Sequence, residues 1–346
     1  MSKKNLTIFA SDLNENTGEG ILGRTFIKKL SLKYDKAIID IITPNQKFIF
    51  KGNFNIIRNR SKNNIFHKYF DPIIGALKLR FIKKKNIVFI NYLPLWNFLI
   101  FLILPKYTIL GPITGTKVVK DKEFIYKLTR KYFFPLFFNI SLTIINKKFK
   151  KIIFSTNLLK ENFYKIKSKF LSNYILDSFK VYKNKNETRI YKKYDLIFYY
   201  RNHKNKFNNE LIKIIDALSK TKKICIIGDK FLSFSKNIFN FGYIPRKKVH
   251  KIMQKTRFAI CGQENLYSFF AVDAYNHGCQ SILDNQLKTF QFAKSKNFHF
   301  IDYKYSEKNL KKILKILNKN KFHKDLKFKR KILKKKKNMN DFINLY

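Results

Sequence analysis

Short apolar runs alternate with amphipathic stretches along the first half of the chain. Uninterrupted apolar runs of this length are typical of strands in a parallel sheet that is covered on both faces. The stretch 21–34 has a helical period instead, because Leu22, Phe26 and Leu30 recur every four residues. The strands predicted in this half are 5–10, 36–43, 86–91, 107–115 and the start of 150–165, which continues as a helix.

The second half alternates more regularly. Its predicted strands are 195–200, 222–230, 237–244, 257–262, 280–285 and 298–303. Its predicted helices are 208–220, 245–256, 268–278 and 306–320. Strands that alternate with helices of this length favour a parallel sheet with helices on both faces.

The length of the chain favours two such domains. A chain of 346 residues exceeds one ordinary hydrophobic core, and domains of about 150 residues are common. The polar stretch 181–194 has no apolar period, so it is interpreted as the linker. The division expected is an N-terminal Rossmann-like domain over 1–180, a C-terminal one over 195–322, and a basic tail over 323–346.

Two stretches are apolar enough to raise the question of a membrane. The segment 87–104 carries no charged residue over 18 positions, the lower limit for a membrane span. Asn91, Pro94 and Asn97 interrupt it, so the alternative is a buried strand over 87–91 and a short helix over 95–103. The stretch 132–145 fits either a core helix or a face pressed onto lipid.

Basic residues far outnumber acidic ones. The chain has 73 Lys and Arg against 22 Asp and Glu, a formal net charge of +51. One interpretation is a compositional bias toward Lys, Asn, Ile and Phe, and another adds an anionic membrane surface as partner. The tail after Lys324 fits a contact with anionic lipid, a solvated helix or a disordered end. Nucleic acid is not expected as a partner, because the basic residues are spread out and no zinc-finger or RNP spacing occurs.

Cysteine and histidine spacing gives no sign of a metal site. Cys225, Cys261 and Cys279 lie far apart within apolar runs and form no C-x-x-C pair, so buried reduced thiols are expected. The six histidines show no H-E-x-x-H spacing. The sequence therefore predicts neither a metal nor a cofactor.

The segment TGEGILGR contains the spacing G-x-G-x-x-G at Gly18, Gly20 and Gly23. A dinucleotide site needs its first glycine directly at the end of the strand. Here Ser11 to Thr17 intervene after Ala10, which is too long a loop for that turn. The glycines still open a helix whose backbone amides can face an anion or a sugar.

An acidic motif in the second half carries more information. The sequence CGQENLYSFFAVDAYNHG places Glu264 in a loop after a strand, Asp273 on the next helix and Gly278 at its end. This arrangement resembles the acidic signature of the GT-B glycosyltransferases, most closely the retaining family 4. The second acid is Asp rather than Glu, and it follows the first by nine positions, one more than in the family.

A basic pair lies at the matching place after the first strand of the second half. In YYRNHKNKF, Arg201 follows the strand and Lys206 lies five residues further on. The pair resembles the Arg and Lys that hold the donor diphosphate in this family. Two cations there can stabilise the negative charge of the leaving diphosphate.

The resemblance implies a GT-B fold, with two Rossmann-like domains facing a cleft and a C-terminal helix that can cross back to the N-terminal domain. It implies a retaining, metal-independent hexosyltransferase that moves a sugar from a nucleotide diphosphate sugar to a hydroxyl of a lipid-linked or surface glycan. Arg201 and Lys206 would hold the diphosphate, Glu264 the donor sugar, and Asp273 the ribose.

Gly18 and Gly20 would form the wall of the N-terminal domain beside the donor, and Glu264, Arg201 and Lys206 are the expected catalytic residues. The basic, apolar N-terminal half favours a cytoplasmic enzyme at the inner face of the cytoplasmic membrane.

Two alternatives remain open. Asp273 can pair locally and never meet a ligand, and the lost glycines fit a non-catalytic polyanion- or membrane-binding protein on the same scaffold.

Overall fold

The computed structural model divides the chain into two compact units. The first contains the described residues up to 155, and the second contains those from 178 to 334. The structure describes residues 6–14, 17–33, 39–43, 54–58, 65–82, 86–90, 97–113, 132–149, 152–155, 178–179, 192–202, 209–263, 265–318, 322–323 and 325–334.

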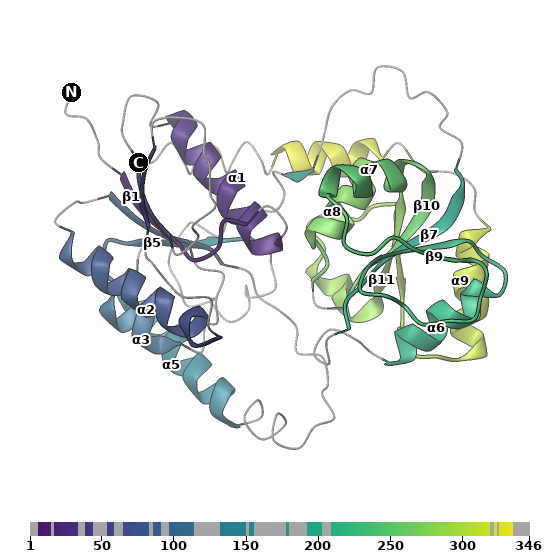
Figure 1. The fold of residues 1–346 in the computed structure, drawn as a ribbon, viewed down its shortest axis with the longest axis horizontal. Helices are drawn as coiled ribbons and strands as arrows, with labels where there is room; N and C mark the ends of the chain where they lie inside the picture. Colours follow the sequence, from purple (N-terminus) through teal and green to yellow (C-terminus); the bar gives the residue numbers. More distant parts are fainter. Residues whose placement is uncertain are drawn as a thin grey trace. The chain divides into compact units, whose positions relative to one another are not determined.

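The first unit is built on a six-stranded parallel sheet (Figure 1). Its strands are β1 (Leu6–Ala10), β2 (Ile39–Thr43), β3 (Phe54–Arg58), β4 (Asn86–Ile90), β5 (Ile109–Ile113) and β6 (Ile152–Phe154). The order across the sheet is β3-β2-β1-β4-β5-β6, the order of a dinucleotide-fold sheet. Every residue of β1 is buried, as expected for a strand covered on both faces.

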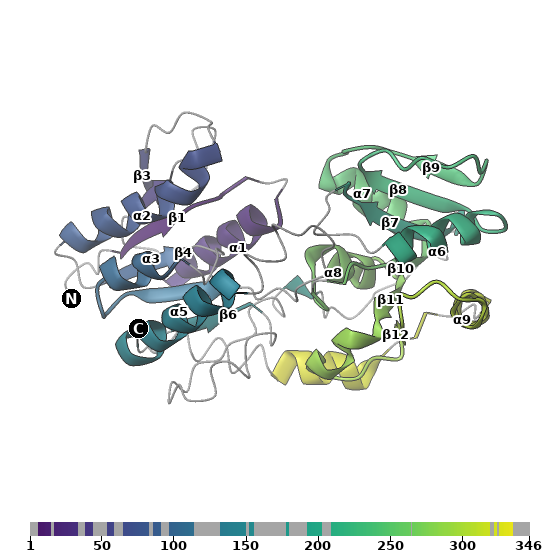
Figure 2. The ribbon, with the colours of Figure 1, turned by 90° about the horizontal axis from the view of Figure 1, so that it is seen from below.

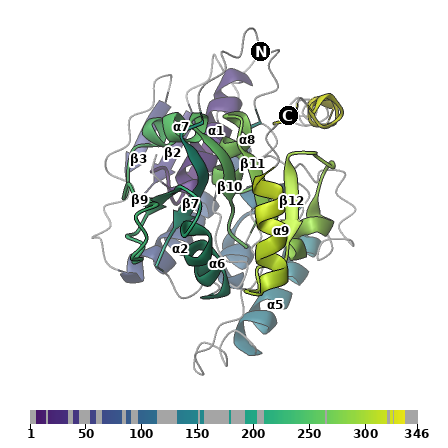
Figure 3. The same ribbon diagram turned by 90° about the vertical axis from the view of Figure 1, so that its right-hand side faces the viewer.

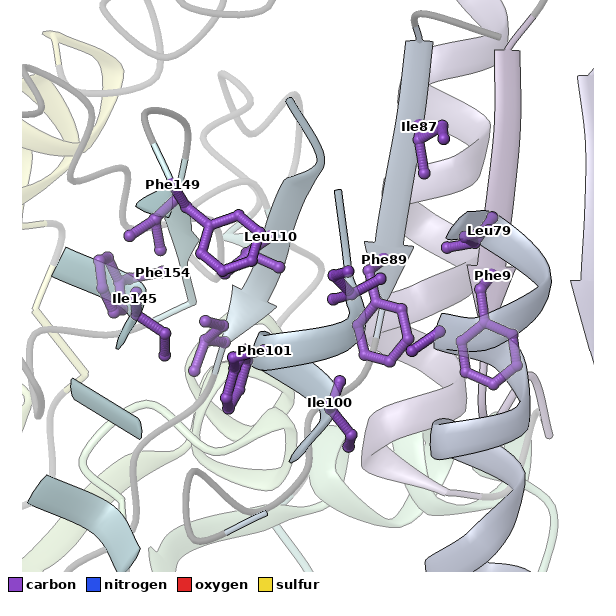
Figure 4. Close-up of a cluster of buried hydrophobic side chains, with 14 of the residues drawn as sticks. Phe9, Leu79, Ile87, Phe89, Ile100, Phe101, Leu110, Ile145, Phe149 and Phe154 are labelled. Carbon is purple, nitrogen blue, oxygen red and sulfur yellow. The ribbon is translucent and has the colours of Figure 1, made fainter. Parts of the chain in front are cut away.

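Helices cover both faces of this sheet. Helix α1 (Gly18–Lys33) buries Leu22, Phe26 and Leu30, which are the positions that the period of four predicts. The other face is covered by α2 (Ile65–Phe81), α3 (Phe98–Ile103) and α5 (Phe134–Lys148). Their inward residues share one core with Phe9, Phe89 and other strand residues (Figure 4).

The second unit repeats this plan with a second six-stranded parallel sheet. Its strands are β7 (Tyr194–Tyr200), β8 (Ile224–Gly228), β9 (Ile238–Asn240), β10 (Thr256–Ile260), β11 (Gln280–Asp284) and β12 (Phe298–Ile301). The order is β12-β11-β10-β7-β8-β9. Counted from β7, this is the same order as in the first unit, read from the opposite edge.

Two pairs of helices enclose the second sheet (Figures 2 and 3). Helices α6 (Asn209–Ser219) and α9 (Glu307–Leu317) bury their apolar faces in one core over the strands. Helices α7 (Arg246–Gln254) and α8 (Phe269–Asn276) pack against each other on the other face. The 3₁₀ helix η4 (Asn285–Phe290) follows β11.

The expected α/β class with two parallel sheets is confirmed, and every predicted strand and helix of the second half is present. Helix α8 ends near Gly278 as predicted, with a φ of +77° that favours glycine at a helix end. The three cysteines are buried and free, as expected.

The apolar segment 87–104 contributes strand β4 and helix α3, which confirms the interpretation as a strand and a short helix. The stretch 132–145 belongs largely to α5, and Leu142 and Ile145 lie in the core. Within the described part of the chain, no helix combines the length and apolar character that crossing a membrane requires.

Part of the basic tail is packed. Residues 326–334 are helical, and the ring of the buried Phe328 contacts the rings of Phe179, Tyr275 and Phe298. This stretch is therefore a helix that packs through Phe328 while most of its lysines stay exposed. Most of the predicted linker and the rest of the tail lie outside the described residues.

Candidate functional site

The strand order of the second unit places a switch point between β7 and β10. In sheets of this kind, the helices leave in opposite directions there, and ligands bind outside the carboxyl ends of the two strands. Arg201 and Asn202 follow β7 directly, and Gly262 and Gln263 follow β10. The basic residue predicted from the sequence thus lies at the edge where this fold binds ligands.

Hydrogen bonds fix the loop that carries Arg201. The N–H of Asn202 donates to Oδ2 of Asp229 at 2.5 Å, and the N–H of Asp229 donates to the carbonyl oxygen of Tyr200 at 2.9 Å. The N–H of Gly228 donates to the carbonyl oxygen of Gly242 at 3.0 Å. The loops after β7, β8 and β9 are therefore joined to one another by hydrogen bonds.

Gly228 permits this close approach. Its φ is +101°, and a Cβ at this position would lie 2.1 Å from the carbonyl oxygen of Tyr200. Such a distance is far inside van der Waals contact, so the two loop backbones could not meet if residue 228 had a side chain.

Asp229 supplies negative charge beside Arg201. The N–H of Asn202 lowers the pKa of the Asp229 carboxyl group, and the Tyr243 hydroxyl and the charge of Arg201 lower it further. The same hydrogen bond from Tyr243 to Asp229 raises the pKa of Tyr243. Asp229 is thus ionised at neutral pH. Its hydrogen bond with the N–H of Asn202 fixes the start of the loop after β7, where Arg201 lies.

Aromatic contacts connect this edge to α8. The rings of Tyr199, in β7, and Phe270, in the first turn of α8, stack with centroids 6.0 Å apart. The guanidinium of Arg246 lies 5.5 Å from the centroid of the Phe269 ring. Ser268 caps the helix, since its Oγ accepts the N–H of Ala271 at 3.2 Å. The acidic-motif helix therefore begins beside the end of β7.

Asp273 is bound by two residues of α7. Nε of Arg246 donates to Oδ2 and Nη2 of Arg246 donates to Oδ1, both at 2.7 Å. Nε2 of His250 lies 3.0 Å from Oδ2. Asp273 is only 7% exposed. Asp273 is therefore paired locally with α7, and its predicted contact with the donor ribose stays a prediction.

The neighbouring groups keep the Asp273 carboxyl group ionised although it is buried. Burial raises the pKa of Asp273, but the hydrogen bonds from His250 and Arg246 and their charges outweigh that effect and lower the pKa overall. A carboxylate offers about four acceptor positions; Arg246 takes one on each oxygen, and His250 lies within ion-pair distance of Oδ2. The second acceptor position of Oδ1 is not used by these contacts.

In the first unit, the predicted glycine loop opens α1. Gly18 is the exposed first residue of the helix, and Thr17 caps it, because Oγ1 of Thr17 accepts the N–H of Gly20 at 3.0 Å. Oγ1 of Thr17 donates in turn to Oδ2 of Asp12 at 2.6 Å. A Cβ on Gly20 would lie 2.1 Å from the carbonyl oxygen of Asn14, so this glycine is required where the loop folds onto the helix.

Lys206 and Glu264 lie outside the described residues, so their predicted roles stay predictions. Sequence reasoning missed Tyr243, Arg246 and His250. Arg246 and His250 are four residues apart and therefore share one face of α7, a spacing that could have indicated a common acidic partner. No group of three or more metal-binding side chains occurs among the described residues.

Neither a protein-family model nor a curated protein matches the chain. Solved structures do resemble it. WaaG, a glycosyltransferase involved in lipopolysaccharide biosynthesis, has a TM-score of 0.58 at 12% identity, with 94% of each chain covered. A glycosyltransferase from Rickettsia africae ESF-5 has a TM-score of 0.57 at 14% identity, covering 99% of this chain and 98% of the other.

The HepE protein of Anabaena, solved in complex with UDP and glucose, has a TM-score of 0.55 at 9% identity, covering 95% of this chain and 92% of that one. At such identities these likenesses establish a fold. The chain has the fold of the GT-B glycosyltransferases, with two parallel α/β sheets and their helices.

Proposed function

We propose that this chain is a retaining glycosyltransferase that moves a hexosyl group from a nucleotide diphosphate sugar to a hydroxyl of a lipid-linked or surface glycan. The observation that carries the proposal is the position of Arg201 at the switch point, on a loop fixed by Asp229. A guanidinium at this edge suits a diphosphate, because it can donate paired hydrogen bonds to phosphate oxygens. The likeness to two glycosyltransferases, and to a protein solved with UDP and glucose, supports the same assignment.

In the proposed reaction, the bond from C1 of the sugar to the diphosphate oxygen breaks, and a bond from C1 to the acceptor oxygen forms on the same face. The proton of the acceptor hydroxyl passes to the leaving phosphate oxygen, so no separate protein base is required. Arg201 and Lys206 stabilise the charge that develops on the diphosphate, which is why we propose that no divalent metal takes part.

The remaining site residues have supporting roles in this proposal. Glu264 contacts the donor sugar, and Gly18 and Gly20 let the backbone of the first unit approach the substrates. Asp273 acts chiefly by holding Arg246 and α7 against α8, and its remaining Oδ1 position accepts one ribose hydroxyl. The proposed location is the cytoplasmic side of the cytoplasmic membrane, where a lipid-linked acceptor would be met.

A screen of nucleoside diphosphates and nucleotide sugars by thermal shift, run with a chelator present, tests the donor class. A ligand at 100 times its dissociation constant should stabilise the protein by about 2.7 kcal/mol. Binding that is lost with the chelator and restored by Mg²⁺ or Mn²⁺ would overturn metal independence. If no nucleotide binds while anionic vesicles do, the non-catalytic alternative replaces the proposal.

Retention is tested on the donor that binds. Slow transfer of its sugar to water releases a free sugar, and proton NMR identifies the anomer released first. The proposal expects the anomer of the donor. First release of the opposite anomer would show inversion and would overturn the internal proton transfer described above.

A further inference from the structure

Helix α2 carries apolar residues on the side that faces away from the core. Phe70, Ile74, Leu77 and Phe81 are all exposed, and Phe81 is 80% exposed. Their spacing of four, three and four places them on one stripe of the helix. Leu79, on the opposite side, is fully buried in the core. The outward stripe is therefore additional to the face that holds the helix on the sheet.

The two neighbouring helices extend this apolar surface. Helix α3 packs against both α2 and α5, and the three helices form one layer over the sheet (Figures 1 and 2). Leu99 and Leu102 of α3 are exposed. At the start of α5, Phe133 and Leu136 are exposed as well. We call these exposed apolar residues of α2, α3 and α5 the outer apolar face.

Among the described residues of α2, α3 and α5 and the turn after α3, the exposed charges have one sign. Asp71 is the one acidic residue in the sequences of α2, α3 and α5, and it is buried. Lys78 and Arg80 are exposed in the last turn of α2, Lys106 is exposed after α3, and Lys147 is exposed at the end of α5. The face therefore combines exposed apolar side chains with basic ones and presents no exposed acid.

The basic residues gather at one end of the layer. Nζ of Lys148 donates to the carbonyl oxygens of Phe101 and Leu102 at 3.0 and 2.6 Å, which joins the ends of α5 and α3. Burial and the nearby charge of Arg80 lower the pKa of Lys148, so the end of α2 lies there too. The carboxyl ends of all three helices thus meet beside a group of cations.

We propose that the outer apolar face docks on the surface of an anionic lipid bilayer. Its Phe, Leu and Ile side chains would enter the boundary between headgroups and acyl chains, and its Lys and Arg side chains would contact lipid phosphates. A second copy of this chain is a poorer occupant than an anionic surface, because both copies carry a formal net charge of +51. The proposal deepens the proposed function, on which it rests for a membrane-linked acceptor, by naming the surface that reaches the membrane.

Sedimentation with vesicles tests the proposal on the full chain. Phosphatidylcholine vesicles with added phosphatidylglycerol should bind the wild type at low salt, and pure phosphatidylcholine vesicles should bind it far less. The variant Ile74→Ser/Leu77→Ser/Phe81→Ser should bind the anionic vesicles at least about tenfold more weakly, because it removes three large apolar side chains. The control Leu232→Ser/Phe234→Ser removes exposed apolar residues of the second unit and should bind like the wild type.

A second measurement reports on insertion without removing the face. In a background where the single tryptophan, Trp96, is replaced by Phe, Phe81→Trp should show blue-shifted fluorescence on addition of anionic vesicles. Phe234→Trp in the same background should not shift. Equal vesicle binding by the two serine variants, or no shift at position 81, would overturn the proposal.

Two further measurements, self-association without lipid and nucleotide binding, show whether the docking proposal or the proposed function has failed. If the wild type self-associates without lipid and the serine variant of α2 does not, the face is an interface between copies and the membrane proposal is wrong. Nucleotide binding by the same variants should be unchanged. If vesicle binding fails while nucleotide binding persists, the docking proposal fails and the proposed function stands; the reverse result rejects the function and keeps the docking surface.

Discussion

The two units share one strand order, yet their helices present different surfaces to the outside. Helix α9 buries Ile313 and Leu317 and exposes Glu307 and several lysines, as an ordinary surface helix does. Helix α2 buries Ala76 and Leu79 in the same way, but its outer stripe is Phe, Ile, Leu and Phe. Because α9 holds its sheet with a charged exterior, the fold does not demand the apolar exterior of α2. That exterior therefore calls for a functional explanation.

The inside and outside of α2 should respond differently to the same substitution. Leu79→Ala should lower the free energy of unfolding by a value in the upper half of about 2–5 kcal/mol, because Leu79 is fully buried and a cavity remains. Leu77→Ala, at a residue that is 39% exposed, should cost less than about 1 kcal/mol. Chemical denaturation of both variants measures the difference, and equal losses would mean that the outer stripe also holds the fold.

Replacing Gly228 with alanine should lower the stability of the second unit more than replacing Gly242. Gly228→Ala should destabilise the protein by about 3 kcal/mol, because its φ is +101° and the new Cβ would meet the carbonyl oxygen of Tyr200. It should also weaken nucleotide binding by moving the Arg201 loop. In Gly242→Ala the backbone also has a positive φ, +65°, but the new Cβ would meet no atom within 4 Å. The loss of stability should therefore be smaller than for Gly228→Ala. Similar losses in both variants would remove the argument for the joined loops.

The ion pair between α7 and α8 should contribute stability that depends on pH. Asp273→Asn should cost about 2 kcal/mol at neutral pH, less than for a fully buried pair because the Arg246 side chain is 37% exposed. The pKa of Asp273 is lowered in the folded protein, so this stability is present above the unfolded pKa of about 3.9 and is lost as pH falls through the folded pKa.

Thermal unfolding of wild type and Asp273→Asn across acidic and neutral pH measures this. The gap between them should be full near neutrality and should close as pH falls below about 4. An unchanged melting temperature together with lost nucleotide affinity would mean that Asp273 acts only through the ribose and that its pair with Arg246 adds no stability.

The sequence predicted the strands well because a strand buried on both faces is an uninterrupted apolar run, as in β1 and β8. Helix α2 was not predicted because its exposed positions are apolar like its buried ones. The difference between a polar and an apolar face, which marks an amphipathic helix in a sequence, is therefore weak. Strand β3 was missed because it is a short edge strand with Asn55 and Ile57 exposed.

The site residues could be predicted only where their position next to a strand in the sequence places them in the fold. Arg201 was predicted because it directly follows a strand and lies five residues before Lys206, as in the pair of the family that it resembles. The partners of Asp273 could not be found in the same way, because Arg246 and His250 meet it through the packing of α7 on α8. An acid at a motif position indicates a place in the fold, but its partners follow from tertiary contacts.

The central claim is that the strand edge of the second unit binds the nucleotide while the outer apolar face does not. Calorimetric titration of the nucleoside diphosphate selected by the thermal screen tests it in four proteins: wild type, Arg201→Ala, the control Arg330→Ala, and Ile74→Ser/Leu77→Ser/Phe81→Ser. A charged hydrogen bond is worth about 1.5–3 kcal/mol, so Arg201→Ala should bind at least about tenfold more weakly. The other two variants should bind like the wild type. Equal affinity in all four proteins would contradict the claim.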